Sequence, residues 1–181
     1  GRGPGCPGPC WAEFELDGAR PRTRAARFPG TQKRICTGVR LQLGAKKLRG
    51  RSLALSHAGP EHTTTIQFLN FQHYLEGTTV ITNSFKLILG LSNNPKIKLI
   101  SVGGRYQKST GSFVGLLTEN ALSQVPSTIL FMSSTSLDGT QLYTHDEDVY
   151  RFKSIFMLNA DQKYYLVDTS KIGKKSMNKQ A

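Results

Sequence analysis

The sequence lacks any apolar run long enough for a signal peptide or a membrane-spanning helix, so we expect a cytoplasmic protein without a membrane partner. Cysteine is also scarce, at three residues among 181. Cys6 and Cys10 are spaced like half of a zinc site, but no second pair of Cys or His follows at ligand spacing, and Cys36 stands alone. The sequence therefore predicts neither a metal nor a cofactor, and its few cysteines indicate a reducing compartment.

Acidic residues are rare in the first third of the chain. Residues 1–51 hold 12 Lys and Arg against 3 Asp and Glu, together with five of the eight prolines. Pro and Gly oppose regular structure, so we expect this basic Gly/Pro/Arg-rich segment to be largely irregular, with residues 1 to about 30 disordered. A basic arm of this kind could bind nucleic acid nonspecifically, although its aromatic residues are too few for a stacking surface.

From residue 52 the sequence alternates between strand and helix patterns. Each unit is near the minimum length of a right-handed crossover, which predicts a doubly wound α/β domain over residues 52–181. Its mainly parallel sheet should have about five or six strands, with helices on both faces. The expected strands are residues 52–56, 78–82, 96–102, 127–132 and 163–167, and the expected helices are 63–75, 84–91, 115–124 and 145–159.

Two of the expected helices depend on specific residues. In the first, Ile66, Leu69 and His73 form the apolar face at spacings of three and four. In the last, Thr144 is the expected N-cap, with Glu147 completing a capping box, which gives the acidic residues at 146–148 a structural role. Residues 106–113 are expected to be a polar loop.

Polar residues follow the expected strands, where ligands bind in open parallel sheets. These loops are 57–65, 82–84, 103–105, 133–139 and 168–171. Thr63, Thr64 and Thr65 would open a helix and could hold a phosphate. Hydroxyl and amide groups of Asn83 and Ser84, the small residues Gly103 and Gly104, and the positive charge of Lys171 would complete such a site, with Asp168 and Ser170 at the same edge.

The motifs TTT, VITNS, GGRY, SFVG and VDTSK, in this order over about residues 63–173, resemble the effector-binding domain of the DeoR family of bacterial sugar-metabolism repressors. The resemblance implies a sheet like that of ribose-5-phosphate isomerase and a phosphorylated sugar as ligand. It implies phosphate contacts for Thr63, Thr64, Thr65 and Lys171. Asn83 and Ser84 would contact the sugar or its supporting loop, Gly103 and Gly104 would admit the ligand, and Asp168 would bind a sugar hydroxyl or hold Lys171.

The chain departs from this family pattern in three places. Pro60, Glu61 and His62 stand before the threonines where the family has an acid, a small residue and Gly-Thr-Thr. No helix-turn-helix is recognisable in residues 1–51, and the sensor domain is expected to be truncated at its C-terminal end. DNA would then be bound only through a domain that this chain does not show.

The leading interpretation is a non-catalytic sensor domain that binds a phosphorylated sugar, with a homo-oligomer as a candidate assembly. The alternative is a sugar-phosphate isomerase or deaminase on the same sheet, with Asp138, Asp168, Glu61 or His62 as the general base. No recognisable catalytic constellation surrounds these residues, and a fold alone does not establish an activity.

Overall fold

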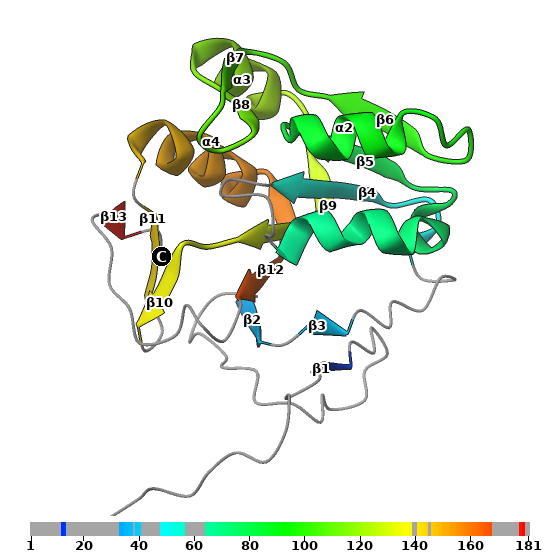
Figure 1. The fold of residues 1–181 in the computed structure, drawn as a ribbon, viewed down its shortest axis with the longest axis horizontal. Coiled ribbons are helices and arrows are strands. Elements are labelled where there is room, and N and C mark those ends of the chain that lie inside the picture. The colour runs from blue at the N-terminus through cyan, green and yellow to red at the C-terminus, as the bar shows by residue number, and fades with distance from the viewer. Residues whose placement is uncertain are drawn as a thin grey trace, which may run out of the picture.

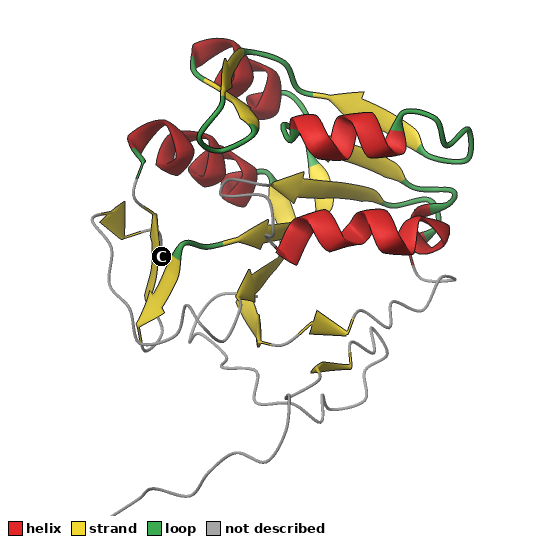
Figure 2. Cartoon of the chain, in the orientation of Figure 1, coloured by secondary structure: helices red, strands yellow, loops and turns green. Residues whose placement is uncertain are grey.

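A parallel sheet between two layers of helices forms the body of the computed structural model (Figures 1 and 2). The structure describes residues 12–13, 33–37, 39–40, 48–56, 64–138, 141–144, 146–167 and 178–179. The doubly wound α/β class expected from the sequence is confirmed. Within the described residues, no helix is long and apolar enough to cross a membrane.

The main sheet has six strands in the order β2-β12-β9-β4-β5-β6, and every neighbouring pair is parallel. The strands are β2 (Lys33–Thr37), β4 (Ser52–Ser56), β5 (Thr79–Thr82), β6 (Lys98–Ser101), β9 (Ser127–Ser133) and β12 (Ala160–Val167). The central strands β4 and β9 are apolar on both faces because helices cover both sides of the sheet. The edge strand β2 comes from residues 1–51, and the domain boundary at residue 51 stays a prediction.

The helices divide between the two faces of the sheet. One face packs against η1 (Thr64–Leu75) and α2 (Phe85–Leu91), through a core that includes Phe68, Leu87 and Phe131. The other face packs against α3 (Leu116–Ser123) and α4 (Glu147–Leu158), through a core that includes Leu122 and Phe152. Complete burial of each large apolar side chain contributes roughly 1.5–3 kcal/mol, so both layers are held by the same hydrophobic effect.

The first expected helix takes a different form. Residues Thr64–Leu75 form a 3₁₀ helix, with a non-helical backbone at Phe71 (φ −125°, ψ 29°). The kink at Phe71 joins two shorter helical stretches; Thr65, Phe68 and Leu75 are completely buried, and Phe71 packs at the edge of the core. The predicted apolar face was wrong at His73, which is exposed.

A hairpin replaces the loop expected at residues 106–113. Strand β7 (Arg105–Gln107) pairs antiparallel with β8 (Ser112–Val114), and the connecting turn ends at Gly111, whose φ of 63° suits glycine. Tyr106 lies opposite Phe113, and their ring centroids are 5.7 Å apart. The sequence did not predict this hairpin because strands of three residues are too short to show an alternation of apolar and polar residues.

The N-cap predicted for α4 was also wrong. Thr144 belongs to β11 (Gln141–Thr144), which pairs antiparallel with β10 (Ser136–Asp138). Asp146 is the N-cap, and its side chain accepts a hydrogen bond from the backbone of Val149. Glu147 pairs with Arg151 one turn later instead of completing a capping box.

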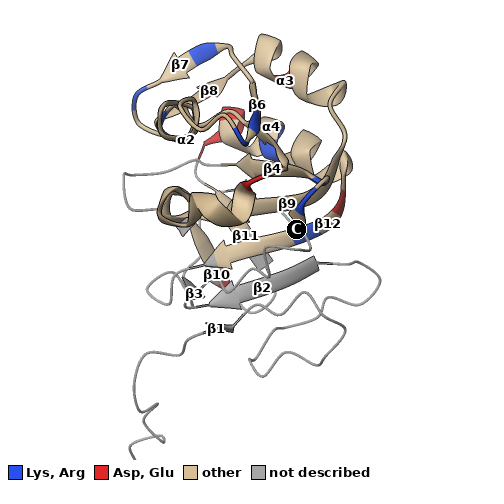
Figure 3. Ribbon diagram, turned by 90° about the vertical axis from the view of Figure 1, so that its right-hand side faces the viewer, with Lys and Arg blue, Asp and Glu red and all other residues tan. Residues whose placement is uncertain are grey.

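Three short strands complete the described elements. β1 (Ala12–Glu13) pairs with β3 (Val39–Arg40), and β13 (Asn178–Lys179) pairs with β11. Figure 3 shows basic and acidic positions spread over several elements. Most of residues 1–51, which carry the excess positive charge, lie outside the described residues, so a nucleic-acid-binding role for them stays a prediction.

Candidate functional site

The winding of the chain defines where a ligand would bind. From β4 the chain proceeds through η1 to β5 and through α2 to β6, moving toward one edge of the sheet. It then returns through α3 to β9, on the other side of β4, and continues through α4 to β12. The strand order therefore reverses between β4 and β9, and ligands of doubly wound sheets bind beyond the carboxyl ends of the strands at such a point.

Unsatisfied polar atoms gather at this edge. Among the described residues, six buried side-chain oxygens have no hydrogen-bond partner. Ser127 starts β9 at the opposite edge, whereas the other five lie at or just beyond the carboxyl ends of β4, β5 and β9: Ser56, Thr65, Asn83, Ser133 and Ser136. Each such group costs about 1–3 kcal/mol when buried unpaired, so their concentration points to a site where a ligand supplies the missing partners.

Ser56 and Ser133 flank the point of reversal directly. Ser56 ends β4, Ser133 ends β9, and the two strands pair with Ser56 opposite Met132. Both serine side chains are completely buried. A ligand that reached the ends of these two strands would meet hydroxyl groups that both donate and accept hydrogen bonds.

Lys153 supports the end of β9 from α4. Its ammonium nitrogen donates a hydrogen bond of 2.6 Å to the carbonyl oxygen of Ser133, and the lysine is completely buried. A buried ammonium is tolerated only where polar groups compensate its charge. Lys153 therefore fixes the backbone from which the Ser133 hydroxyl projects.

Asn83 is held by the hairpin. Its side-chain Nδ2 donates to the carbonyl oxygen of Phe113 at 2.9 Å, and the Phe113 backbone N–H donates to the Asn83 carbonyl oxygen at 2.9 Å. The side-chain Oδ1 is the atom left unpartnered. β8 thus sets the orientation of the Asn83 amide.

Ser84 and its neighbour Thr82 already have structural contacts. The Ser84 hydroxyl caps α2 by accepting from the backbone N–H of Leu87 at 3.4 Å. Thr82 donates to the carbonyl oxygen of Leu55 at 2.6 Å and accepts from the Ser84 backbone at 3.1 Å. These contacts explain why hydroxyl residues follow β5, and a ligand contact by Ser84 stays a prediction.

The two glycines after β6 differ in their surroundings. A Cβ on Gly103 would have no heavy atom within 4 Å. Gly104 has a φ of +148°, and a Cβ there would lie 2.1 Å from the hydroxyl oxygen of Thr118, which donates to the Gly103 carbonyl at 2.8 Å. Gly104 is therefore needed for packing, while Gly103 leaves the backbone open to close approach.

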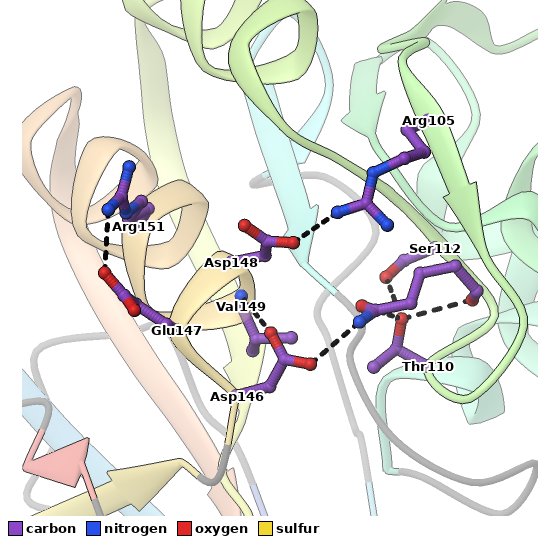
Figure 4. A network of polar contacts seen from close by, with 9 residues as sticks. Arg105, Thr110, Ser112, Asp146, Glu147, Asp148, Val149 and Arg151 are labelled. Carbon is purple, nitrogen blue, oxygen red and sulfur yellow. Dashed lines mark hydrogen bonds and ion pairs between the residues drawn. The ribbon is translucent and has the colours of Figure 1, made fainter.

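The hairpin is fastened to the start of α4 by polar contacts (Figure 4). Arg105 forms an ion pair with Asp148, and the side chain of Gln107 donates to Asp146 at 2.7 Å. Thr110 bonds to Gln107 and lies 2.9 Å from the Ser112 hydroxyl. The acidic residues at 146–148 thus have structural partners, as the sequence analysis expected.

The predicted site residues are only partly within the described residues. Thr65 lies in the first turn of η1, completely buried, and Asn83 and Gly103 follow β5 and β6 at the same edge of the sheet. Thr64 begins η1. Ser84 and Gly104 are described above, whereas Thr63, Asp168, Ser170 and Lys171 lie outside the described residues, as do the candidate bases Glu61 and His62.

Sequence reasoning did not single out Ser56, Ser133, Ser136 or Lys153. The two later serines were within a polar loop expected at this edge. The position of Lys153 could have been recognised from helical spacing. It stands four residues after Val149 and three before Phe156, which are both buried on the apolar face of α4. A charged residue on a buried helix face indicates a specific partner.

A doubly wound sheet with polar groups at its switch point is typical of α/β domains that bind small ligands. The family model described as the DeoR C terminal sensor domain matches residues 61–181. That range is more than half of the chain, so this chain belongs to the DeoR C-terminal sensor domain family.

The matching curated proteins include transcriptional regulators. The HTH-type transcriptional regulator IolR of Bacillus subtilis is 32% identical over 116 residues, which cover 64% of this chain and 46% of that protein. The lactose phosphotransferase system repressor of Staphylococcus epidermidis is 34% identical over 116 residues, covering 61% and 45%. This chain therefore spans less than half the length of these relatives. A solved ribose 5-phosphate isomerase from Methanocaldococcus jannaschii aligns with 72% of this chain and 52% of its own, at 18% identity and a TM-score of 0.45.

Proposed function

We propose that this chain is the effector-sensing domain of a transcriptional repressor of carbohydrate metabolism, and that a phosphorylated sugar binds at the carboxyl ends of β4, β5 and β9. The observation that carries the proposal is the group of buried oxygens without partners at this edge, with Ser56 and Ser133 on either side of the switch point. A sugar has many hydroxyl groups that donate and accept at once, which is the chemistry these oxygens require. The repressor relatives named above support the regulatory role.

The phosphate would be held beside the first turn of η1. Thr65 is buried there with an unpartnered hydroxyl, and Thr64 starts the helix. Backbone N–H groups at a helix start attract anions. Lys171 is expected to supply the full positive charge, with Asp168 and Ser170 beside it.

Binding alone suffices for this function, without catalysis. A ligand that binds one conformation or assembly more tightly shifts the population toward it, by no more than its differential affinity. In the whole protein the shift would change operator occupancy through a separate DNA-binding domain. Homo-oligomer formation and a cytoplasmic location remain predictions from the sequence.

Isothermal titration of the 181-residue chain tests the proposal. The panel contains glucose 6-phosphate, galactose 6-phosphate, fructose 1-phosphate and ribose 5-phosphate, with inorganic phosphate as a separate arm. At least one sugar phosphate should bind more tightly than inorganic phosphate does. If no sugar phosphate binds, the proposal is wrong.

Substitution of two serines of β9 tests where the ligand binds. The Ser133→Ala substitution removes an unpartnered hydroxyl at the carboxyl end of the strand, and Ser127→Ala removes one at the opposite end. Loss of a ligand hydrogen bond worth about 1.4 kcal/mol weakens binding about tenfold. Ser133→Ala should show this loss and Ser127→Ala should bind like the wild type. Equal effects of the two substitutions would place the ligand elsewhere.

A further inference from the structure

Ser56 and Asn83 stand at the ends of two neighbouring strands. In the β4–β5 pairing, Ala54 lies opposite Ile81 and Leu55 lies opposite Thr82; Ser56 then ends β4, and Asn83 is the residue that follows β5. Side chains alternate between the faces of a sheet, and Ala54 and Ile81 both belong to the core beneath α3 and α4. The same alternation puts Ser56, and Asn83 directly after β5, on that face, at the ends of neighbouring strands whose backbones lie about 4.8 Å apart.

The amide of Asn83 has a defined orientation. A carbonyl oxygen only accepts hydrogen bonds, so the group of Asn83 that faces the Phe113 carbonyl at 2.9 Å must be the NH₂ and not the oxygen. Asn83 Oδ1 then points away from this contact and has no partner, although the residue is completely buried. The site consequently presents an atom that accepts a hydrogen bond and cannot donate one.

This polarity selects the kind of ligand group that fits. A ligand hydroxyl can donate its proton to Asn83 Oδ1 and at the same time accept a proton from the Ser56 hydroxyl, whose oxygen is also unpartnered. A phosphate or carboxylate oxygen brings only lone pairs and would be repelled by Asn83 Oδ1. A CH₂ group would leave both protein oxygens unpaired.

We propose that Ser56 and Asn83 form a subsite that binds one hydroxyl group of the effector by hydrogen bonds and thereby sets the specificity of the binding site. The inference rests on the proposed function and adds the orientation of the ligand in the site. The hydroxylated carbon faces Ser56 and Asn83, and the anionic group lies toward η1. The effector class is then a sugar phosphate that retains this hydroxyl, and the corresponding deoxy sugar phosphate is rejected. A site that leaves a buried polar group unpaired disfavours the analogue about tenfold to a hundredfold.

The test compares sugar phosphates with their deoxy analogues. The sugar phosphate that binds most tightly in the titration panel is measured beside each of its monodeoxy forms, using wild type, Ser56→Ala and Ser127→Ala. Ser56→Ala is chosen because an Asn83 substitution also breaks the contact with Phe113 and endangers folding. Removing an unpartnered buried hydroxyl should leave the fold intact.

For the wild type and Ser127→Ala, one deoxy analogue should bind about 10- to 100-fold more weakly than the parent compound. For Ser56→Ala this ratio should fall several-fold, because the substitution and the deoxygenation remove the same interaction. An unchanged ratio, or equal binding of every analogue to the wild type, overturns the subsite and leaves the proposed function standing. If no sugar phosphate of the panel binds at all, the proposed function fails, and the subsite fails with it.

Discussion

The ammonium group of Lys153 lies 2.6 Å from the carbonyl oxygen of Ser133, and both side chains are completely buried. This contact joins α4 to the end of β9, where the candidate site begins. A hydrogen bond from a charged donor contributes about 1.5–3 kcal/mol. Lys153→Met preserves the length and apolar stem of the side chain. We expect it to lower the free energy of unfolding by about 2 kcal/mol, measured by urea denaturation.

Lys163→Met is the matched control for this experiment. The Lys163 ammonium also donates to a backbone carbonyl, that of Ala160, at 2.7 Å, but it is only partly buried. Water can replace the lost donor there, so the free energy of unfolding should change by less than about 1 kcal/mol. Equal losses for the two variants would show that the Lys153 contact has no special value.

Gly104 should not tolerate a side chain, whereas Gly103 should. At Gly104 a methyl group would overlap the Thr118 hydroxyl, in a backbone conformation that favours glycine. Gly104→Ala should therefore lower the free energy of unfolding by about 1–3 kcal/mol. Gly103→Ala meets no atom within 4 Å and should leave stability within about 0.5 kcal/mol of the wild type. Thermal and urea denaturation of both variants measure the difference, and similar losses would contradict the expectation.

The acidic residues at the start of α4 should contribute unequally. Asp146 caps the helix at 3.1 Å from the Val149 nitrogen and also accepts from Gln107, so Asp146→Ala should cost about 1–2 kcal/mol. Asp148 forms a surface ion pair with Arg105, whose side chain is 63% exposed. Exposed pairs contribute less than about 1 kcal/mol and weaken in salt. Urea denaturation at 0.05 and 1 M NaCl should show a salt-dependent loss for Asp148→Ala, and a larger, mostly salt-independent loss for Asp146→Ala.

The sequence predicted five of the six strands of the main sheet, for a physical reason, but not β2, which lies in the segment that was expected to be largely irregular. Strands β4 and β9 are buried on both faces, and short apolar runs bounded by polar residues are hard to mistake in an alternating α/β pattern. The 3₁₀ form of η1 was missed because spacings of three and four coexist in its sequence. Only packing showed that its completely buried residues are Thr65, Phe68 and Leu75.

The sequence indicated the edge of the sheet at which the candidate site is proposed, but not the polarity of its atoms. Polar residues after consecutive strands indicated the carboxyl edge, and Asn83 was among them. Which atom of Asn83 is left without a partner depends on Phe113, thirty residues later, in a hairpin that the sequence did not predict. The same holds for Ser133, whose contact with Lys153 spans twenty residues. Contacts of this kind depend on the packed structure, so local pattern cannot supply them.

Because Tyr165 is buried, the free energy of unfolding is expected to fall at alkaline pH. The residue is completely buried, its hydroxyl donates to the weak acceptor Sδ of Met157 at 2.6 Å, and burial raises the pKa of this tyrosine well above its ordinary value. In the unfolded chain the same tyrosine loses its proton near pH 10. Above that pH the folded state therefore binds more protons than the unfolded state, so stability falls as the pH rises. At pH 11 the loss should be about 1 kcal/mol relative to pH 8.

Tyr165→Phe separates this effect from the titration of other groups. Phenylalanine keeps the ring in the core and has no proton to lose, so the variant should lose about 1 kcal/mol less than the wild type between pH 8 and pH 11. At pH 8 the two proteins should differ by less than about 1 kcal/mol, because a thioether sulfur is a poor hydrogen-bond acceptor. Urea denaturation at half-unit pH intervals gives both curves. If they run parallel through pH 11, the buried hydroxyl does not limit alkaline stability, and Tyr165 must reach solvent when it ionises.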